Sequence, residues 1–288
     1  MSYVVRNGLL VPKKEVVRRG ATHVRVPRAN LILRRIADPI LRPARMAVGF
    51  DAAGTASSFG TVTGATGLTD SNLTVSAAGN CVIYLVSANS VSSLAGVAAH
   101  WDSAGANQAM TSIVTVGNTN GFQPQVVYIF GLVAPSTGNK TFKLSGTWGT
   151  ALPIVVFGCS FTGANQAGGA TTFNYTGTHT NVSSSTAVTV TCTTTANDAV
   201  VACMNGVNNA GTETIAMGQT SLFASTPGTT YAASGGNYEL GGTPTVTMTG
   251  TLSASDFWAA VATNIAGAVS VVVASPAAGL MGLASCEW

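Results

Sequence analysis

The pair His100 and Asp102, on either side of Trp101, is the one place in the chain where a histidine and a carboxylate lie two residues apart. On a strand these two side chains share a face, so they could begin a metal site or orient a general base. A zinc site needs three or four ligands, and the other histidines, His23 and His179, stand in no HxxxH or HExxH spacing. We therefore predict no metal site, and we interpret the pair as a polar rim beside Trp101.

The carboxylates of residues 47–288 are scattered along the chain. None of the eight lies within four residues of another: Asp51, Asp70, Asp102, Asp198, Glu213, Glu239, Asp256 and Glu287. Asp198 and Asp256 fall in predicted turns, where aspartate is common. Two distant carboxylates can still converge in a fold as in glycosidases, but the chain has no P-loop and no GxGxxG. The stretch 158–162 lacks the last glycine of GxSxG. We predict no catalytic residue, no cofactor and no enzymatic activity.

The five cysteines form no CxxC motif. Cys81, Cys159 and Cys203 lie inside apolar runs, which predicts buried, reduced side chains. If Asn197 and Asp198 form a two-residue turn, Cys192 and Cys203 oppose each other across a hairpin. Since cross-strand geometry often disfavours a bridge, a disulfide between them stays an open alternative.

Four aromatic residues are candidates for stacking on sugar rings if they are exposed. They are Trp101, Trp148, Tyr231 and Tyr238. The competing interpretation places each ring in the hydrophobic core or at a hairpin tip. Both interpretations are compatible with the sequence.

Charge is divided sharply between the beginning of the chain and the rest. Only 8% of the 288 residues are charged, against about 25% in an average domain, which excludes a coiled coil and a charge-rich disordered chain. Eleven of the 13 basic residues lie in the first 46 positions: Arg6, Lys13, Lys14, Arg18, Arg19, Arg25, Arg28, Arg34, Arg35, Arg42 and Arg45. With two acids among them the segment carries a net charge of +9, while the remainder carries −6. Residues 1–46 and the remainder of the chain are therefore expected to have different physical roles.

Residues 1–46 are predicted to form an extended basic arm. Four prolines divide the segment, which leaves room for one helical turn around 29–36. Its apolar runs are short and interrupted by basic residues, so we expect no signal peptide; a transit peptide is the alternative. The apolar stretch 266–284 is rich in small residues and broken by Pro276, so we expect no membrane span.

The composition of the arm predicts what it binds. Arginines can form bidentate contacts with carboxylates, and the aliphatic side chains of Leu31, Leu33 and Ile40 can fill grooves between them. Nucleic acid is the rival partner. It is disfavoured because the only aromatic residue of the arm is Tyr3, which leaves no platform for stacking bases. We therefore expect the arm to dock on an acidic protein surface.

From Val48 onward the sequence reads as short strands separated by Gly, Asn, Ser and Thr. The predicted strands are Leu73–Ser76, Cys81–Ser87, Ile113–Val116, Val126–Val133, Thr141–Ser145, Ile154–Phe161, Ala187–Cys192, Ala199–Met204, Thr243–Thr249, Phe257–Ile265 and Val269–Ala274. No stretch keeps a helical period. The pattern predicts an all-β fold, an antiparallel β-sandwich or jelly roll.

An internal repeat divides this part of the chain. Lys143–Ala164 aligns without a gap on Thr247–Ala268, and both contain Gly-Thr and Gly-Ala at the same places. We infer two similar β modules, 47–166 and 167–268, either as two sandwiches or as halves of one larger one. Residues 269–288 follow as a C-terminal strand and a tail of small residues.

The segments VVYIFGLVAPSTGNKTFKLS (Val126–Ser145), VVFGCSFTGA (Val155–Ala164) and FWAAVATNIAGA (Phe257–Ala268) resemble a β-sandwich type often encoded by tailed bacteriophages. The resemblance covers about residues 50–266 and omits the arm. It implies a virion accessory component: a capsid decoration, head-fibre or tail-fibre protein. The pattern includes no catalytic residues.

These observations lead to one expected function. We expect a non-enzymatic structural protein of a phage virion, assembled in the host cytoplasm and anchored through its arm. Its partners would be other virion proteins, such as the major capsid protein or neighbouring shell or tail subunits, and it would form a homo-oligomer within the assembly. The alternative is a glycan-binding adhesin or a receptor-binding module of a tail fibre.

Overall fold

The computed structural model describes residues 3–6, 9–12, 44–120, 123–207, 213–225 and 232–270. The chain divides into two units, Met1–Ile40 and Leu41–Trp288. In the first unit, β1 (Tyr3–Arg6) and β2 (Leu9–Pro12) form an antiparallel hairpin in which Tyr3 pairs with Pro12. The predicted arm thus contains a hairpin near its start. The predicted helical turn around 29–36 lies outside the described residues.

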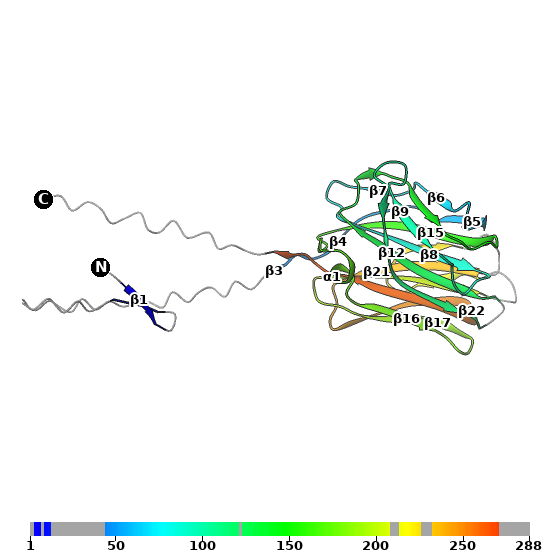
Figure 1. Cartoon of the computed structure of the whole chain (residues 1–288). Coiled ribbons are helices and arrows are strands. Elements are labelled where there is room, and N and C mark those ends of the chain that lie inside the picture. The colour runs from blue at the N-terminus through cyan, green and yellow to red at the C-terminus, as the bar shows by residue number, and fades with distance from the viewer. Residues whose placement is uncertain are drawn as a thin grey trace, which may run out of the picture. The chain divides into compact units, whose positions relative to one another are not determined.

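The second unit is a stack of antiparallel β-sheets, which confirms the predicted all-β sandwich class (Figure 1). The first outer sheet has the order β10-β9-β14-β6, and the first inner sheet has the order β11-β12-β8-β15-β4, with β5 also paired to β15. Short strands β7 and β13 pair beside them. The bounds are β4 (Gly49–Ala53), β5 (Ser57–Val62), β6 (Leu68–Asp70), β7 (Thr74–Val75), β8 (Cys81–Asn89), β9 (Ala98–Trp101), β10 (Gln108–Ala109), β11 (Thr111–Asn118), β12 (Gln125–Val133), β13 (Gly138–Asn139), β14 (Phe142–Ser145) and β15 (Leu152–Thr162).

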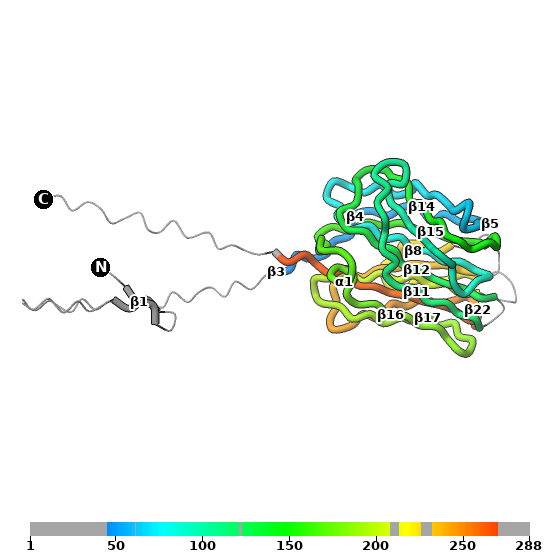
Figure 2. The backbone as a smooth tube through the Cα atoms, viewed as in Figure 1, coloured from blue at the N-terminus to red at the C-terminus, as the bar shows by residue number. Residues whose placement is uncertain are grey.

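The second half of this unit builds two further sheets after the single turn of helix α1 (Gly169–Thr172). The second inner sheet has the order β16-β22-β18-β21-β20, and the second outer sheet joins β17 and β19 to β22. The bounds are β16 (Thr176–Thr180), β17 (Ser185–Thr193), β18 (Ala199–Val207), β19 (Ile215–Met217), β20 (Thr220–Ser225), β21 (Ala232–Leu240) and β22 (Thr245–Ile265). Figure 2 shows β14 and β5 at one side of the stack and β16 and β17 at the other.

Position in the stack explains the two kinds of strand in the sequence. The inner strands β8 and β18 are buried along their whole length, because sheets cover both of their faces. They accordingly read as continuous apolar runs. The outer strands β6 and β14 alternate between buried and exposed side chains, which is the pattern of a sheet with one solvent-exposed face.

The longest strand, β22, is where the predicted strand pattern is wrong. Thr243–Thr249 and Phe257–Ile265 were expected as separate strands with Asp256 in a turn, yet all of Thr245–Ile265 is one strand. Its first part pairs with β17 and β19 in the second outer sheet, and its last part pairs with β16 and β18 in the second inner sheet. The polar middle of β22 therefore carries the chain from one sheet to the other without a turn.

The two halves of the stack share one topology. The order β11-β12-β8-β15 in the first inner sheet corresponds to β20-β21-β18-β22 in the second. Phe161 of β15 pairs with Cys81 at the start of β8, and Ile265 of β22 pairs with Ala199 at the start of β18. The predicted equivalence of the strands containing Ile154–Phe161 and Trp258–Ile265 is thus confirmed in strand order and register. The module boundaries, 47–166 and 167–268, stay predictions.

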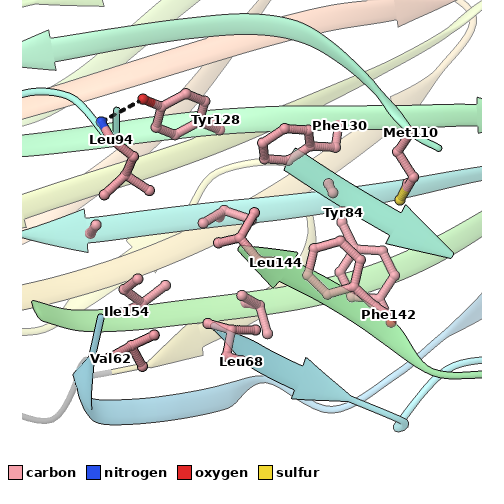
Figure 3. Close-up of a cluster of buried hydrophobic side chains, with 14 of the residues drawn as sticks. Val62, Leu68, Tyr84, Leu94, Met110, Tyr128, Phe130, Phe142, Leu144 and Ile154 are labelled. Carbon is pink, nitrogen blue, oxygen red and sulfur yellow. Dashed lines mark hydrogen bonds between the residues drawn. The ribbon is translucent and has the colours of Figure 1, made fainter. Parts of the chain in front are cut away.

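Three hydrophobic cores separate the four sheets. In the first, Tyr84 stacks on Phe142 with ring centroids 3.8 Å apart, and the Tyr128 hydroxyl accepts a 2.8 Å hydrogen bond from the amide of Leu94 (Figure 3). The middle core lies between the inner sheets and includes side chains from both halves, such as Phe157 stacked on Phe223. Because this core belongs to both halves, the stack packs as one body.

A chain of buried polar side chains crosses the middle core. The hydroxyls of Ser87 and Ser234 lie 2.6 Å apart, and Ser234 donates to Oδ1 of Asn205 at 3.1 Å. Asn205 in turn donates through Nδ2 to Oδ1 of Asn89 at 2.7 Å. Since buried polar groups are costly without partners, these bonds favour one relative placement of the inner sheets.

Candidate functional site

The root of the basic arm is built into the body by a two-stranded ribbon. β3 (Ala44–Arg45) pairs antiparallel with β23 (Val269–Ser270), so that Arg45 lies opposite Val269. Just inside the ribbon, the Met46 amide donates to the carbonyl of Ala268 at 2.7 Å. β3 and β23 therefore lie side by side where they project from the rest of the second unit, as Figure 1 shows.

Asp198 anchors the arm root to the body. Its carboxylate is fully buried and accepts from the amide of Thr195 at 3.0 Å and from Nδ2 of Asn264 at 3.1 Å. The amide of Gly267 donates to it at 3.2 Å, and Nη1 of Arg45 lies 3.7 Å from Oδ1. A buried carboxylate is tolerated when it is hydrogen-bonded and paired in this way. The turn before β18, the end of β22 and the arm thus meet at one side chain.

The sequence placed Asp198 near a turn but did not identify it as an anchor. The turn is present, since the amide of Asp198 donates to the carbonyl of Thr195 at 3.0 Å. Its partners Arg45, Asn264 and Gly267 are distant in sequence, so local pattern carries no signal of their meeting. Of the predicted docking residues, Arg6 lies in β1, and Arg45 alone has a described side chain. The other twelve lie outside the described residues.

Most of the acidic side chains in the described part of the body are buried. Of the seven in the described part, five are buried: Asp70, Asp102, Asp198, Glu213 and Asp256. Asp70 accepts from Ser57 and Tyr84, and Oε1 of Glu213 accepts from the Ser253 amide and hydroxyl. Only Asp51 and Glu239 among these seven are partly exposed. In the described part of the body, most of the carboxylate charge is therefore not displayed as an acidic surface.

Asp51 illustrates how the body uses its carboxylates. Burial by itself raises the pKa of Asp51, but hydrogen bonds from the hydroxyls of Ser160 and Ser76 and from the Ser76 amide outweigh it, so the pKa is lowered. Asp51 thereby ties β4 to β15 and to the turn after β7 as an ionised acceptor. This is a structural role.

The predicted pairing of His100 and Asp102 on one strand face is wrong. β9 ends at Trp101, and Asp102 has a φ of +50°, which turns its side chain into the following loop. There its carboxylate accepts from the Ala106 amide at 3.0 Å and lies 3.6 Å from Nζ of Lys140. Chiefly the Ala106 hydrogen bond lowers the pKa of Asp102. Throughout the described ranges, no three His, Cys, Asp or Glu side chains gather in a way that could hold a metal ion.

The alternative of a Cys192–Cys203 disulfide is also wrong, because both thiols are free. β17 carries Cys192 in the second outer sheet, while β18 carries Cys203 in the second inner sheet. The turn between these strands thus changes sheets and does not close a hairpin. Cys81, Cys159 and Cys203 are buried among apolar side chains, as predicted. Burial raises the pKa of the Cys203 thiol to about 12.

Two of the four candidate sugar-stacking aromatics are buried. Trp101 is 0% exposed and donates through Nε1 to the Ser136 carbonyl, and Trp148 is 7% exposed. Exposure of these two rings is therefore excluded, because both belong to the first core. Tyr238 is half-buried and stacks on Phe50 with ring centroids 4.6 Å apart. Tyr231 lies outside the described residues.

In the part of the chain that the structure describes, no helix has the length and apolar character needed to cross a bilayer. The site that the geometry singles out is the arm root, the ribbon of β3 and β23 that is held at Asp198. Comparisons of the chain with protein-family models, with curated proteins and with solved structures find no match.

Proposed function

We propose that this chain is a non-enzymatic structural protein of a phage virion that is anchored to neighbouring virion proteins through its basic arm. The observation that supports this most directly is the unmatched charge of the arm. The segment carries +9, while five of the seven acids in the described body are buried. Because the described part of the body displays little negative surface, the arm would have its electrostatic partner on another molecule.

Apolar side chains around the arm root support a protein partner. Among the described residues, five large apolar side chains are exposed, and three of them lie at this end: Met46, Leu240 and Val269. Val269 belongs to the ribbon, Met46 directly follows β3, and Leu240 pairs with Ala199, the neighbour of Asp198. A shell subunit with acidic and apolar surface would match both the arginines and these side chains.

The test is incorporation into particles. Because residues 44–48 are bonded to the body, the truncation is made after Ile40, the end of the first unit. We expect the tagged full-length chain to co-purify with particles on a density gradient, and the chain lacking residues 1–40 to stay in the soluble fraction with an unchanged melting temperature. Val182→Ser, an 85% exposed position, serves as the control for surface substitution.

Three outcomes would contradict the proposal. A truncated chain that incorporates at normal occupancy would make the arm incidental. A full-length chain absent from particles would remove the virion role. A full-length chain lost from particles when their nucleic acid is digested would assign the arm to nucleic acid. The glycan-binding alternative would be favoured by a clear hit on a glycan array, although Trp101 and Trp148 are buried.

A further inference from the structure

The first unit of the chain contains a hairpin whose outer edges are open. β1 pairs antiparallel with β2, from Tyr3 opposite Pro12 to Arg6 opposite Leu9. Among the described residues, neither of these strands pairs with a third. A hairpin of two strands is marginally stable at best in water, and three or more strands with an apolar face are needed for independent stability. The hairpin therefore indicates that a further strand joins it.

The two edges of the hairpin are not equivalent. β2 ends at Pro12, which has no amide donor and is confined to the outer edge of a sheet. β1 contains no proline, and its residues Tyr3, Val4 and Val5 all have high β propensity. Arg6 is the only charged residue in the two strands. The edge that can accept a further strand is thus the edge of β1.

The register determines which backbone groups β1 presents at that edge. Two residues separate Arg6 from Leu9, and a two-residue connection makes this a hydrogen-bonded pair. Hydrogen-bonded and non-hydrogen-bonded pairs alternate along an antiparallel ladder. Val4 therefore also bonds to β2, while the amides and carbonyls of Tyr3 and Val5 face the open edge. An incoming antiparallel strand must present its own free groups at the same two-residue spacing.

The β1 strand of a second copy meets this requirement. A twofold axis at Val4 sets Tyr3 of each copy opposite Val5 of the other, so that both pairs can exchange backbone hydrogen bonds. Aromatic and β-branched residues are favourable cross-strand partners. Each Val4 then stands opposite its own copy, and the two Arg6 residues lie at opposite ends of the paired strands. An axis at Val5 would instead set Arg6 opposite Val4, a charge against an apolar residue.

We propose that two copies of this chain associate through their β1 edges into one sheet of order β2-β1-β1-β2, with a twofold axis at Val4. This inference goes beyond the proposed function, because it concerns residues 3–12 and leaves the rest of the arm for docking. A second copy is favoured over an unrelated edge strand because β1 is complementary to itself in hydrogen-bond spacing and in charge. Association then needs no other protein.

The test is self-association of the full-length chain, measured by sedimentation velocity over a range of concentrations. We expect a reversible dimer for the wild-type chain and a monomer after deletion of residues 1–12. Val4→Lys and Val4→Glu should each weaken the dissociation constant about tenfold, since like charges would meet at the axis in a non-hydrogen-bonded pair. An equimolar mixture of the two variants should return to within about threefold of wild type, because opposite charges then face each other.

Val11→Lys is the matched control. Val11 pairs with Val4 within the hairpin and shares its face of the sheet, but it belongs to the outer strand. The dissociation constant of this variant should therefore stay within about threefold of wild type.

Three results would overturn the inference. They are a full-length chain that stays monomeric at all concentrations, a dimer that survives deletion of residues 1–12, and a mixture of Val4→Lys and Val4→Glu that associates no more tightly than either variant alone. Incorporation into particles is measured separately. Normal incorporation of a chain that does not self-associate would remove this inference and leave the proposed function standing.

Discussion

Nη1 of Arg45, on a side chain that is 42% exposed, lies 3.7 Å from Oδ1 of Asp198, on a side chain that is completely buried. The two partners therefore contribute unequally to the stability of the folded chain. Arg45 keeps contact with water, which screens its half of the pair. Asp198 is also the acceptor for three further donors, so its removal leaves those donors buried without a partner.

Asp198→Ala is expected to lower the free energy of unfolding by about 3 kcal/mol, whereas Arg45→Ala should lower it by less than about 1 kcal/mol. Denaturant titration followed by circular dichroism measures both values. Equal effects of the two substitutions would show that the ion pair, and not the hydrogen-bonded carboxylate, holds the arm root.

Asn205→Ala is expected to cost about 3 kcal/mol of stability, because it empties a buried site and leaves Ser234 and Asn89 without their partner. Ser87→Ala removes only one end of the same chain of bonds, and about 1 kcal/mol is expected. The measurement is again the free energy of unfolding by denaturant. A neutral Asn205→Ala would mean that the inner sheets are placed by apolar packing alone.

The two halves of the stack should unfold in a single transition, since the middle core contains side chains from both. Trp101 and Trp148 report on the first half, and Trp258 reports on the second. We compare fluorescence with circular dichroism in Trp258→Phe/Trp288→Phe and in Trp101→Phe/Trp148→Phe/Trp288→Phe. Within each variant the two signals should share one midpoint. A separate fluorescence midpoint in either variant would establish independently folding modules.

The buried thiols should make the folded chain unreactive and sensitive to alkaline pH. Burial raises the pKa of Cys192 to about 11 and that of Cys203 to about 12, above the ordinary value of 9.0. The folded thiols keep their protons at a pH where unfolded ones ionise. Their contribution to stability is therefore complete below about pH 9 and is lost as the pH rises toward 11 and 12.

A Cys286→Ser variant tests this, since Cys81, Cys159, Cys192 and Cys203 are all buried. At pH 8 a thiol reagent should label none of the four in the folded chain and all four in denaturant. The free energy of unfolding should be constant up to about pH 8.5 and fall between about pH 9 and 11. Rapid labelling of the folded chain would show that the sheets open readily.

Features that depend on neighbouring residues could be predicted from the sequence alone. Continuous apolar runs identified β8, β15 and β18 because strands covered on both faces have no polar side to show. The recurrence of turns and apolar runs predicted two halves with the same strand order, whereas the extended arm predicted from the clustered arginines lies mostly outside the described residues and stays a prediction. These signals are local, so they can be read from the sequence before the sheets are assembled.

Features that depend on which sheet a strand joins were decided by the tertiary structure. Cys192 and Cys203 are close in sequence but belong to different sheets, and β22 passes through Asp256 because both of its ends find partners. Asp198 holds the arm root because β3 and the residues that follow β22 both contact its carboxylate. Trp101 is buried because the first outer sheet packs over β8 and β12. Strand pairing and sheet stacking join residues far apart in the chain, and their energies depend on the assembled partners. A single sequence does not contain that information in its local pattern.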